Sequence, residues 1–77
     1  MEWRHDYHYE GGFRLEVRQH FGLYKDTYSA ELHEGPRLPI TEPLWSIEGC
    51  DSSGMAKYQG ELAISALLKK RAEAEAA

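Results

Sequence analysis

The spacing of apolar residues changes once along this chain, and the change separates a region that predicts strands from a region that predicts a helix. Before residue 48, apolar side chains recur at every second position of several segments, as in strands with one buried face. From Met55 onward the spacing is three and four residues, which is typical of a helix. Between the two regions lie Asp51, Ser52 and Ser53, and a side-chain oxygen of any of them can cap the helix start. The chain therefore predicts a sheet followed by one helix.

Four segments of the first region predict strands, at about residues 3–9, 13–21, 27–33 and 44–48. The second segment is the clearest, because its apolar residues fall on one face and charged residues fill most of the other. Gly11 and Gly12 separate it from the first segment, and a glycine pair at that place is typical of a hairpin. Three prolines and Gly35 predict a loop at residues 34–43.

The second region predicts one helix over about residues 52–71 and a frayed tail at 72–77. Gly60 in mid-helix costs about 1 kcal/mol relative to alanine, which is explained if the helix must approach the aromatic-rich sheet closely there. The face expected to cover the sheet comprises Met55, Ala56, Gln59, Gly60, Leu62, Ala63, Ala66 and Leu67. The expected fold is therefore α+β, an antiparallel meander of three to four strands packed on one face by a single C-terminal helix.

Size and composition indicate a single small domain, residues 1–77. Hydrophobic residues make up 42% of the chain, far more than in disordered proteins. A core this small is often completed by a disulfide, a metal or a second subunit, so a homodimer is one expected outcome. Cys50 is the one cysteine, which excludes a disulfide within the chain, and the longest apolar run is too short to span a bilayer. These features predict a cytoplasmic protein without membrane contact.

Acidic residues outnumber basic residues ten to five in residues 1–51, and the formal net charge of the chain is −4. A nucleic-acid-binding protein normally carries a basic stripe, so direct binding of nucleic acid is not expected. The one basic run, Lys69 to Arg71, suits the C-terminal end of a helix. Five acidic residues are expected to form an acidic sheet face that binds a partner: Asp6, Glu10, Glu16, Glu31 and Glu34.

Three further residues are candidates for contact with a partner or with a second copy of the chain. Ile64 and Leu68 are neighbours on the helix surface and lie off the expected sheet-facing stripe. They either face a partner or pack against the sheet edge or the long loop. Tyr24 lies at the turn after the second predicted strand, and tyrosine is enriched at the centre of protein interfaces.

No group of residues has the spacing of a catalytic or metal site. His5 and His8 point to opposite faces of a strand, and His20 with His33 supplies two ligands where a closed site needs more. Cys50 lies near a helix start, where a thiolate is stabilised, but spacing places no histidine or acid beside it. We expect Cys50 to be structural, with a reactive thiol as the alternative, and we expect no enzyme activity, metal or cofactor.

Three resemblances bear on function. The run EGCDSSGMAK, from Glu48 to Lys57, leads from strands into an alanine-rich helix and resembles the C-terminal half of a double-stranded-RNA-binding domain. The same order of elements also resembles small antitoxins related to the HicB family. In size, acidity and build, the chain is similar to phage-encoded inhibitors of bacterial defence, including anti-CRISPR proteins. This last resemblance implies a larger host protein or ribonucleoprotein complex as the partner.

The leading hypothesis is a non-enzymatic protein-binding module of phage or mobile-element origin. It would inhibit a bacterial defence complex by steric and electrostatic occupation of a nucleic-acid-binding surface. The alternative is a nucleic-acid-associated regulator, such as an antitoxin-like or RNA-binding-domain-like subunit, and a third hypothesis is an accessory subunit of an enzyme. Salt dependence separates the first two, because binding to nucleic acid weakens steeply as salt rises.

Overall fold

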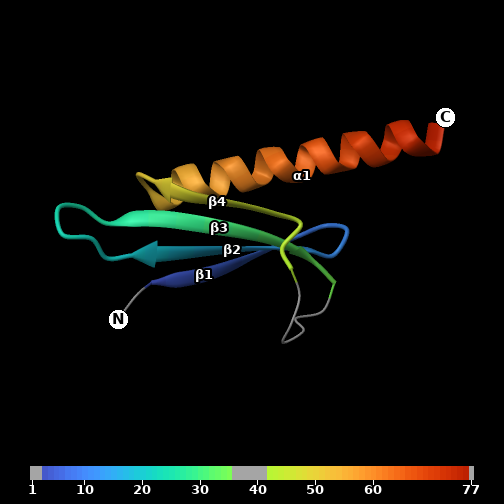
Figure 1. The fold of residues 1–77 in the computed structure, drawn as a ribbon. Coiled ribbons are helices and arrows are strands. Elements are labelled where there is room, and N and C mark those ends of the chain that lie inside the picture. The colour runs from blue at the N-terminus through green and yellow to red at the C-terminus, as the bar shows by residue number, and fades with distance from the viewer. Residues whose placement is uncertain (1–2, 36–41, 77) are drawn as a thin grey trace.

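The fold is a four-stranded antiparallel sheet with one long helix across one of its faces (Figure 1). The computed structural model describes residues 3–35 and 42–76. The strands follow one another across the sheet in sequence order, so the predicted α+β meander is confirmed. The elements are β1 (Arg4–Tyr9), β2 (Phe13–His20), β3 (Thr27–Glu34), β4 (Trp45–Cys50) and α1 (Ser53–Ala76).

The predicted boundaries differ most at the end of the helix. α1 continues to Ala76, so the predicted end near residue 71 is too early, and residues 72–76 are helical instead of frayed. These residues alternate alanine with glutamate, and both favour helix. Of the loop predicted at residues 34–43, residues 36–41 lie outside the described residues.

Gly11 and Gly12 close the hairpin between β1 and β2. Tyr9 pairs with Phe13, which leaves a three-residue loop whose glycines have φ angles of +85° and +83°. A residue with a side chain is strained in this left-handed region, so the glycine pair is required by the turn. The carbonyl oxygen of Gly12 also accepts a hydrogen bond from the amide of Gly35 at 3.0 Å, which ties the hairpin to the end of β3.

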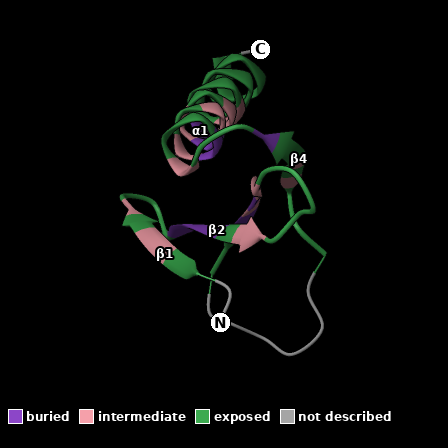
Figure 2. Cartoon of the chain, turned by 90° about the vertical axis from the view of Figure 1, so that its left-hand side faces the viewer, coloured by how far each residue is buried: buried purple, intermediate pink, exposed green. Residues whose placement is uncertain are grey.

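The strand register places the apolar side chains on the face beneath α1. Leu15 of β2 lies between Tyr7 of β1 and Leu32 of β3, and side chains paired in this way point to the same side of the sheet. Figure 2 shows the buried part of α1 facing the sheet and the exposed part facing away. The buried apolar residues form one core between sheet and helix: Phe13, Leu15, Val17, Ala30, Leu32, Cys50, Ala56 and Ile64.

Small residues let α1 lie close to β2. The buried residues of the helix are Ala56, Gly60 and Ile64, which line up at a spacing of four residues. A Cβ atom on Gly60 would lie 2.5 Å from both methyl carbons of Leu15. The close approach predicted at Gly60 is confirmed, although the neighbour is Leu15 instead of an aromatic ring.

The sheet-facing side of α1 differs from the predicted one. Ile64 was expected to lie off this side but is 7% exposed and belongs to the core, so the predicted partner contact at Ile64 is wrong. Met55 and Leu62 were expected to cover the sheet but are exposed. The reason is that the helix lies closest to the sheet at Gly60, and residues roughly 140–160° around the helix from Gly60 must face solvent.

Long side chains join α1 to the sheet in the middle of the packed region and again further along the helix. The Tyr9 hydroxyl donates a hydrogen bond to Glu61 Oε2 at 3.0 Å, and burial together with this acid raises the pKa of Tyr9 to about 12. Further along the helix, Arg71 donates to both carboxylate oxygens of Glu34 at 2.7 and 2.8 Å. Its guanidinium also lies 5.5 Å from the ring centre of Phe13. The helix is thereby fixed to β1 and β3 as well as to the core.

Ser52 is the cap of α1 among the three predicted candidates, because its Oγ accepts a hydrogen bond from the Met55 amide at 3.0 Å. Ser52→Ala leaves this amide without its acceptor and is expected to lower the free energy of unfolding by about 1 kcal/mol, as measured by urea denaturation. Ser53→Ala removes a hydroxyl group from the neighbouring serine, which does not cap the helix, and is the matched control. An equal loss in both variants would show that Ser52 is not the cap.

Candidate protein-binding surfaces

The sheet face opposite α1 carries an ion-pair network centred on Glu16 of β2. The Glu16 side chain is 4% exposed, and its Oε1 accepts hydrogen bonds from Nη2 and Nε of Arg18 at 2.6 and 2.8 Å. Nε of Arg4 lies 2.9 Å from the same oxygen, and Nη1 of Arg14 lies 3.5 Å from Oε2. The hairpin register explains this convergence, since Arg4 pairs with Arg18 across β1 and β2.

The arginines keep Glu16 ionised in spite of its burial. Burial alone raises the pKa of this carboxyl group, but the hydrogen bond from Arg18 and the charges of Arg18, Arg4 and Arg14 outweigh burial, so the pKa lies below its usual value. The hydrogen bond to Glu16 in turn raises the pKa of Arg18. Glu16 therefore adds little negative potential to the surface, because its charge is compensated within the network.

The five predicted acidic residues do not form one acidic face. Glu34 pairs with Phe13 and so lies on the helix side of the sheet, where it binds Arg71. Glu10 is exposed in the hairpin loop, and Glu31 Oε2 lies 3.3 Å from His33 Nε2. Asp6, like Glu16, has an arginine beside it, with Arg4 Nη2 at 3.6 Å. The expected acidic face is therefore wrong, because basic residues alternate with the acids on the same surface.

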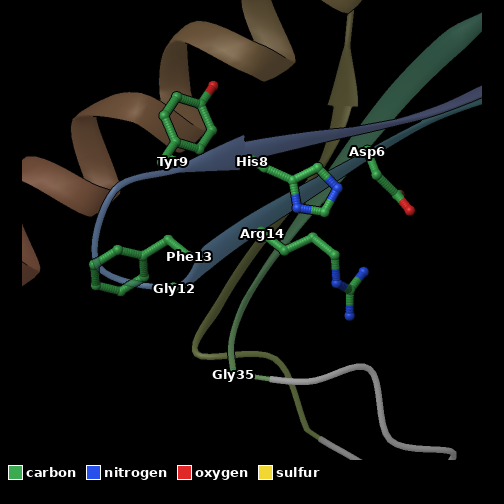
Figure 3. Close-up of a pocket in the computed structure, with 7 residues that line it drawn as sticks. All are labelled: Asp6, His8, Tyr9, Gly12, Phe13, Arg14 and Gly35. Carbon is green, nitrogen blue, oxygen red and sulfur yellow. The ribbon is translucent and has the colours of Figure 1, made fainter.

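A hollow of about 470 Å³ opens on this face, beside the end of the hairpin (Figure 3). The side chains of His8 and Arg14 point to the same side of the hairpin, away from Tyr9. Nε of Arg14 is buried and has no hydrogen-bond partner among the described residues. The mixed charges of the lining suit a polar side chain of a partner. The lining consists of Asp6, His8, Tyr9, Gly12, Phe13, Arg14 and Gly35.

Glu16, Glu31 and His33 bring three possible metal-ligand atoms within 4.8 Å of one another in the described part of the chain. Arginine side chains already lie against both carboxylate oxygens of Glu16. A cation at this position would lie beside three guanidinium groups, and their repulsion would oppose its binding. The geometry therefore favours an ion-pair network over a metal centre.

The loop between β2 and β3 presents large apolar side chains to solvent. Leu23 is 97% exposed and Tyr24 is 100% exposed, and Phe21 beside them is also exposed. Leu23 and Tyr24 thus offer almost their whole side chains to a partner, and exposed apolar surface of this kind can mark a site of protein contact. Tyr24, a residue predicted to contact a partner, thus lies where a partner can reach it, and the contact itself stays a prediction.

This loop is anchored to the rest of the fold. Nζ of Lys25 lies 2.8 Å from Oδ1 of Asp51, and this bond raises the pKa of the lysine and lowers that of the aspartate. Nε2 of Gln19 donates to Oδ2 of Asp26 at 2.8 Å. At Gly22, a Cβ atom would collide with the carbonyl group of Lys25, so the turn requires glycine. These contacts hold the loop in a defined conformation.

α1 carries a second exposed apolar surface, the outer stripe, which consists of Met55, Tyr58 and Leu62. These residues are spaced three and four apart, so they share the side of the helix that faces away from the sheet. The sequence analysis missed the stripe because it assigned Met55 and Leu62 to the sheet-facing side of the helix. The small residues Ala56 and Gly60 mark the sheet-facing side, and Met55 and Leu62 lie across the helix from Gly60. Leu68 is also exposed, but it lies about 120° around the helix from Leu62.

Cys50 lies at the end of β4 and is buried in the core. Burial and the nearby charge of Asp51 both raise the pKa of its thiol. A raised pKa lowers the thiolate fraction, and the thiolate is the reactive form of cysteine. The structure therefore favours a packing role for Cys50 over a reactive thiol.

The helix of the described region, α1, has no stretch that is both apolar and long enough to cross a bilayer. No family model matches the sequence, and no match was found among the curated proteins or the solved structures.

Proposed function

We propose that this protein is a non-enzymatic protein-binding module that docks a larger partner through the loop between β2 and β3. The observation that carries the proposal is the nearly complete exposure of Leu23 and Tyr24 on an anchored loop. Exposed leucine and tyrosine side chains gain free energy when a partner's apolar pocket removes them from water. Because Gly22 and the Lys25–Asp51 pair restrict the backbone of the loop, less backbone entropy is lost on binding than for an unrestrained loop.

The proposal extends to the action of the module, which is to block a surface of its partner by steric occupation. The net charge of −4 favours a basic partner surface, such as the nucleic-acid channel of a defence complex. An inhibitor of phage or mobile-element origin that acts in the host cytoplasm fits this proposal. The compensated charges around Glu16 favour apolar docking by the loop as the main source of affinity over mimicry of nucleic acid by the sheet face.

Replacing both Leu23 and Tyr24 with serine is expected to weaken partner binding at least about 30-fold, because the loss of one hot-spot residue alone costs about 2 kcal/mol or more. Thermal stability should not change, since both side chains are exposed. The measurement is capture of proteins from a bacterial lysate on the immobilised chain, with quantification by mass spectrometry and a titration of the captured partner.

The matched control replaces Tyr58 and Leu62 of the outer stripe with serine, which removes the same two residue types from a different surface. This control should retain the partner that the loop variant loses. Equal capture by the loop variant and the unmodified chain would overturn the proposal. Binding of duplex RNA that falls steeply with salt would favour a nucleic-acid-associated regulator instead.

A further inference from the structure

We infer that α1 pairs with α1 of a second copy of this chain, in antiparallel orientation, to form a homodimer. The interface is the outer stripe together with Ser65, which follows Leu62 at a spacing of three. The surface is separate from the loop between β2 and β3, so the inference goes beyond the proposed function and does not depend on it.

The spacing of the exposed residues matches a helix–helix seam. Met55, Tyr58, Leu62 and Ser65 are separated by three, four and three residues and are all exposed. This alternation is the a and d pattern by which two helices pack side by side. On the far side of the helix, Gly60 and Ile64 face the sheet, so one helix can contact the sheet and a second helix at the same time. The dimer then has four layers, with the two helices between the two sheets.

The surface area of the single chain supports a second copy as the occupant. The accessible surface is 5686 Å², whereas a compact monomer of 8.8 kDa is expected to expose about 4800 Å². The excess is roughly 900 Å², and a standard interface buries about 800 Å² on each partner. The radius of gyration, 13.7 Å, also exceeds the value of about 11.5 Å expected for a compact domain of 77 residues. The excess belongs to the whole elongated chain, whose extents are 50 × 25 × 18 Å, and the outer stripe contributes part of it.

The orientation follows from where the apolar and charged residues lie along α1. In an antiparallel pair whose two-fold axis crosses the solvent side of α1 at the level of residue 60, Tyr58 packs against Leu62 of the second copy, and Met55 packs against Ser65. Lys69, which continues the seam, then lies level with residue 51, just before the start of the second copy's α1, and the Lys69 side chains of the two copies lie far apart. A parallel pair would place Lys69 against Lys69, so like charges would meet.

The test is the mass of the full chain in solution, measured by sedimentation equilibrium over a range of concentrations. The unmodified chain is expected at twice 8.8 kDa, and Leu62→Glu is expected at the monomer mass with an unchanged circular dichroism spectrum. Leu23→Glu makes the same change at a leucine that is 97% exposed elsewhere, so this control should stay dimeric. A monomeric unmodified chain, or a Leu62→Glu variant that remains dimeric, would overturn the inference.

Disulfide trapping tests the orientation. The double variant Met55→Cys/Ser65→Cys should form a crosslinked dimer under mild oxidation, because each new cysteine faces the other one across the two-fold axis. Met55→Cys alone should not crosslink, and the unmodified chain controls for the buried Cys50. Efficient crosslinking of Met55→Cys alone would indicate a parallel pair and overturn the antiparallel arrangement.

Discussion

Gly60→Val is expected to lower the free energy of unfolding by about 3 kcal/mol, because the new side chain would overlap Leu15 in a packed core. Leu15 is fully buried, so its methyl groups cannot move aside without displacing other core residues. A domain of this size has a total stability of roughly 4–12 kcal/mol. The loss is therefore a large part of the total, and urea denaturation followed by circular dichroism measures it.

The matched controls for Gly60 use the same helix. Gly54→Ala places a Cβ atom 3.9 Å from Oγ of Ser52, which is an ordinary van der Waals contact, and should be neutral or stabilising because alanine favours helix more than glycine does. Gly60→Ala should destabilise in spite of the same gain in helix propensity. Combining Gly60→Ala with Leu15→Ala should cost less than the sum of the two single variants, since the new methyl group enters the space that Leu15 vacates. Equal effects of alanine at positions 54 and 60 would contradict the close approach.

Glu16→Ala is expected to lower the free energy of unfolding by about 3 kcal/mol, because it leaves three arginines close together without their shared carboxylate. Arg4 and Arg18 are partly exposed and can turn toward water, so the loss stays at the lower end of the range for a broken buried ion pair. Arg14 is buried and cannot do so. Chemical denaturation at neutral pH measures the loss. Glu48→Ala, at an exposed position of β4, is the matched control and should have little effect.

The effect of Glu16 should also depend on pH. The pKa of Glu16 in the folded protein lies below its ordinary value of 4.5, so its stabilising contribution is complete above this value. The contribution is lost as the pH falls through the folded-state pKa. The stability difference between the unmodified chain and Glu16→Gln should therefore be constant near neutral pH and shrink below pH 4.5. A difference that grows as the pH falls would contradict the ion-pair network.

The strands and their order could be predicted because each strand has one face richer in apolar residues, and the alternation of residue types shows which face packs against the helix. The helix rotation could not be read in the same way, since apolar residues occur all around α1. Met55 and Leu62 look equivalent to Ile64 in the sequence, and the contact between Gly60 and Leu15 selects among them. The sequence analysis predicted a close approach at Gly60 but did not use Gly60 as the centre of the packed side.

The charge network was missed for a different reason. Acids and bases were counted by segment, whereas the network depends on which residues meet across the hairpin. The predicted hairpin turns at Gly11 and Gly12, so Tyr9 pairs with Phe13. If this pairing is continued along both strands, Arg4 lies opposite Arg18, and Glu16 is close to both. Tyr24 was predicted to contact a partner; it is fully exposed, because a turn between two strands leaves its side chains little to pack against, and the contact itself stays a prediction.

The position of β1 at the edge of the sheet has a consequence for aggregation. The Trp3 carbonyl accepts a hydrogen bond from the Gln19 amide at 2.8 Å, so the backbone groups of Arg4, Asp6 and His8 point outward, away from β2. An open strand edge of this kind is a template on which strands of other molecules can add. All three residues carry ionisable side chains, and an added strand would have to strip water from them. This edge therefore resists growth of the sheet into fibrils, and neutral substitutions along β1 would remove that protection.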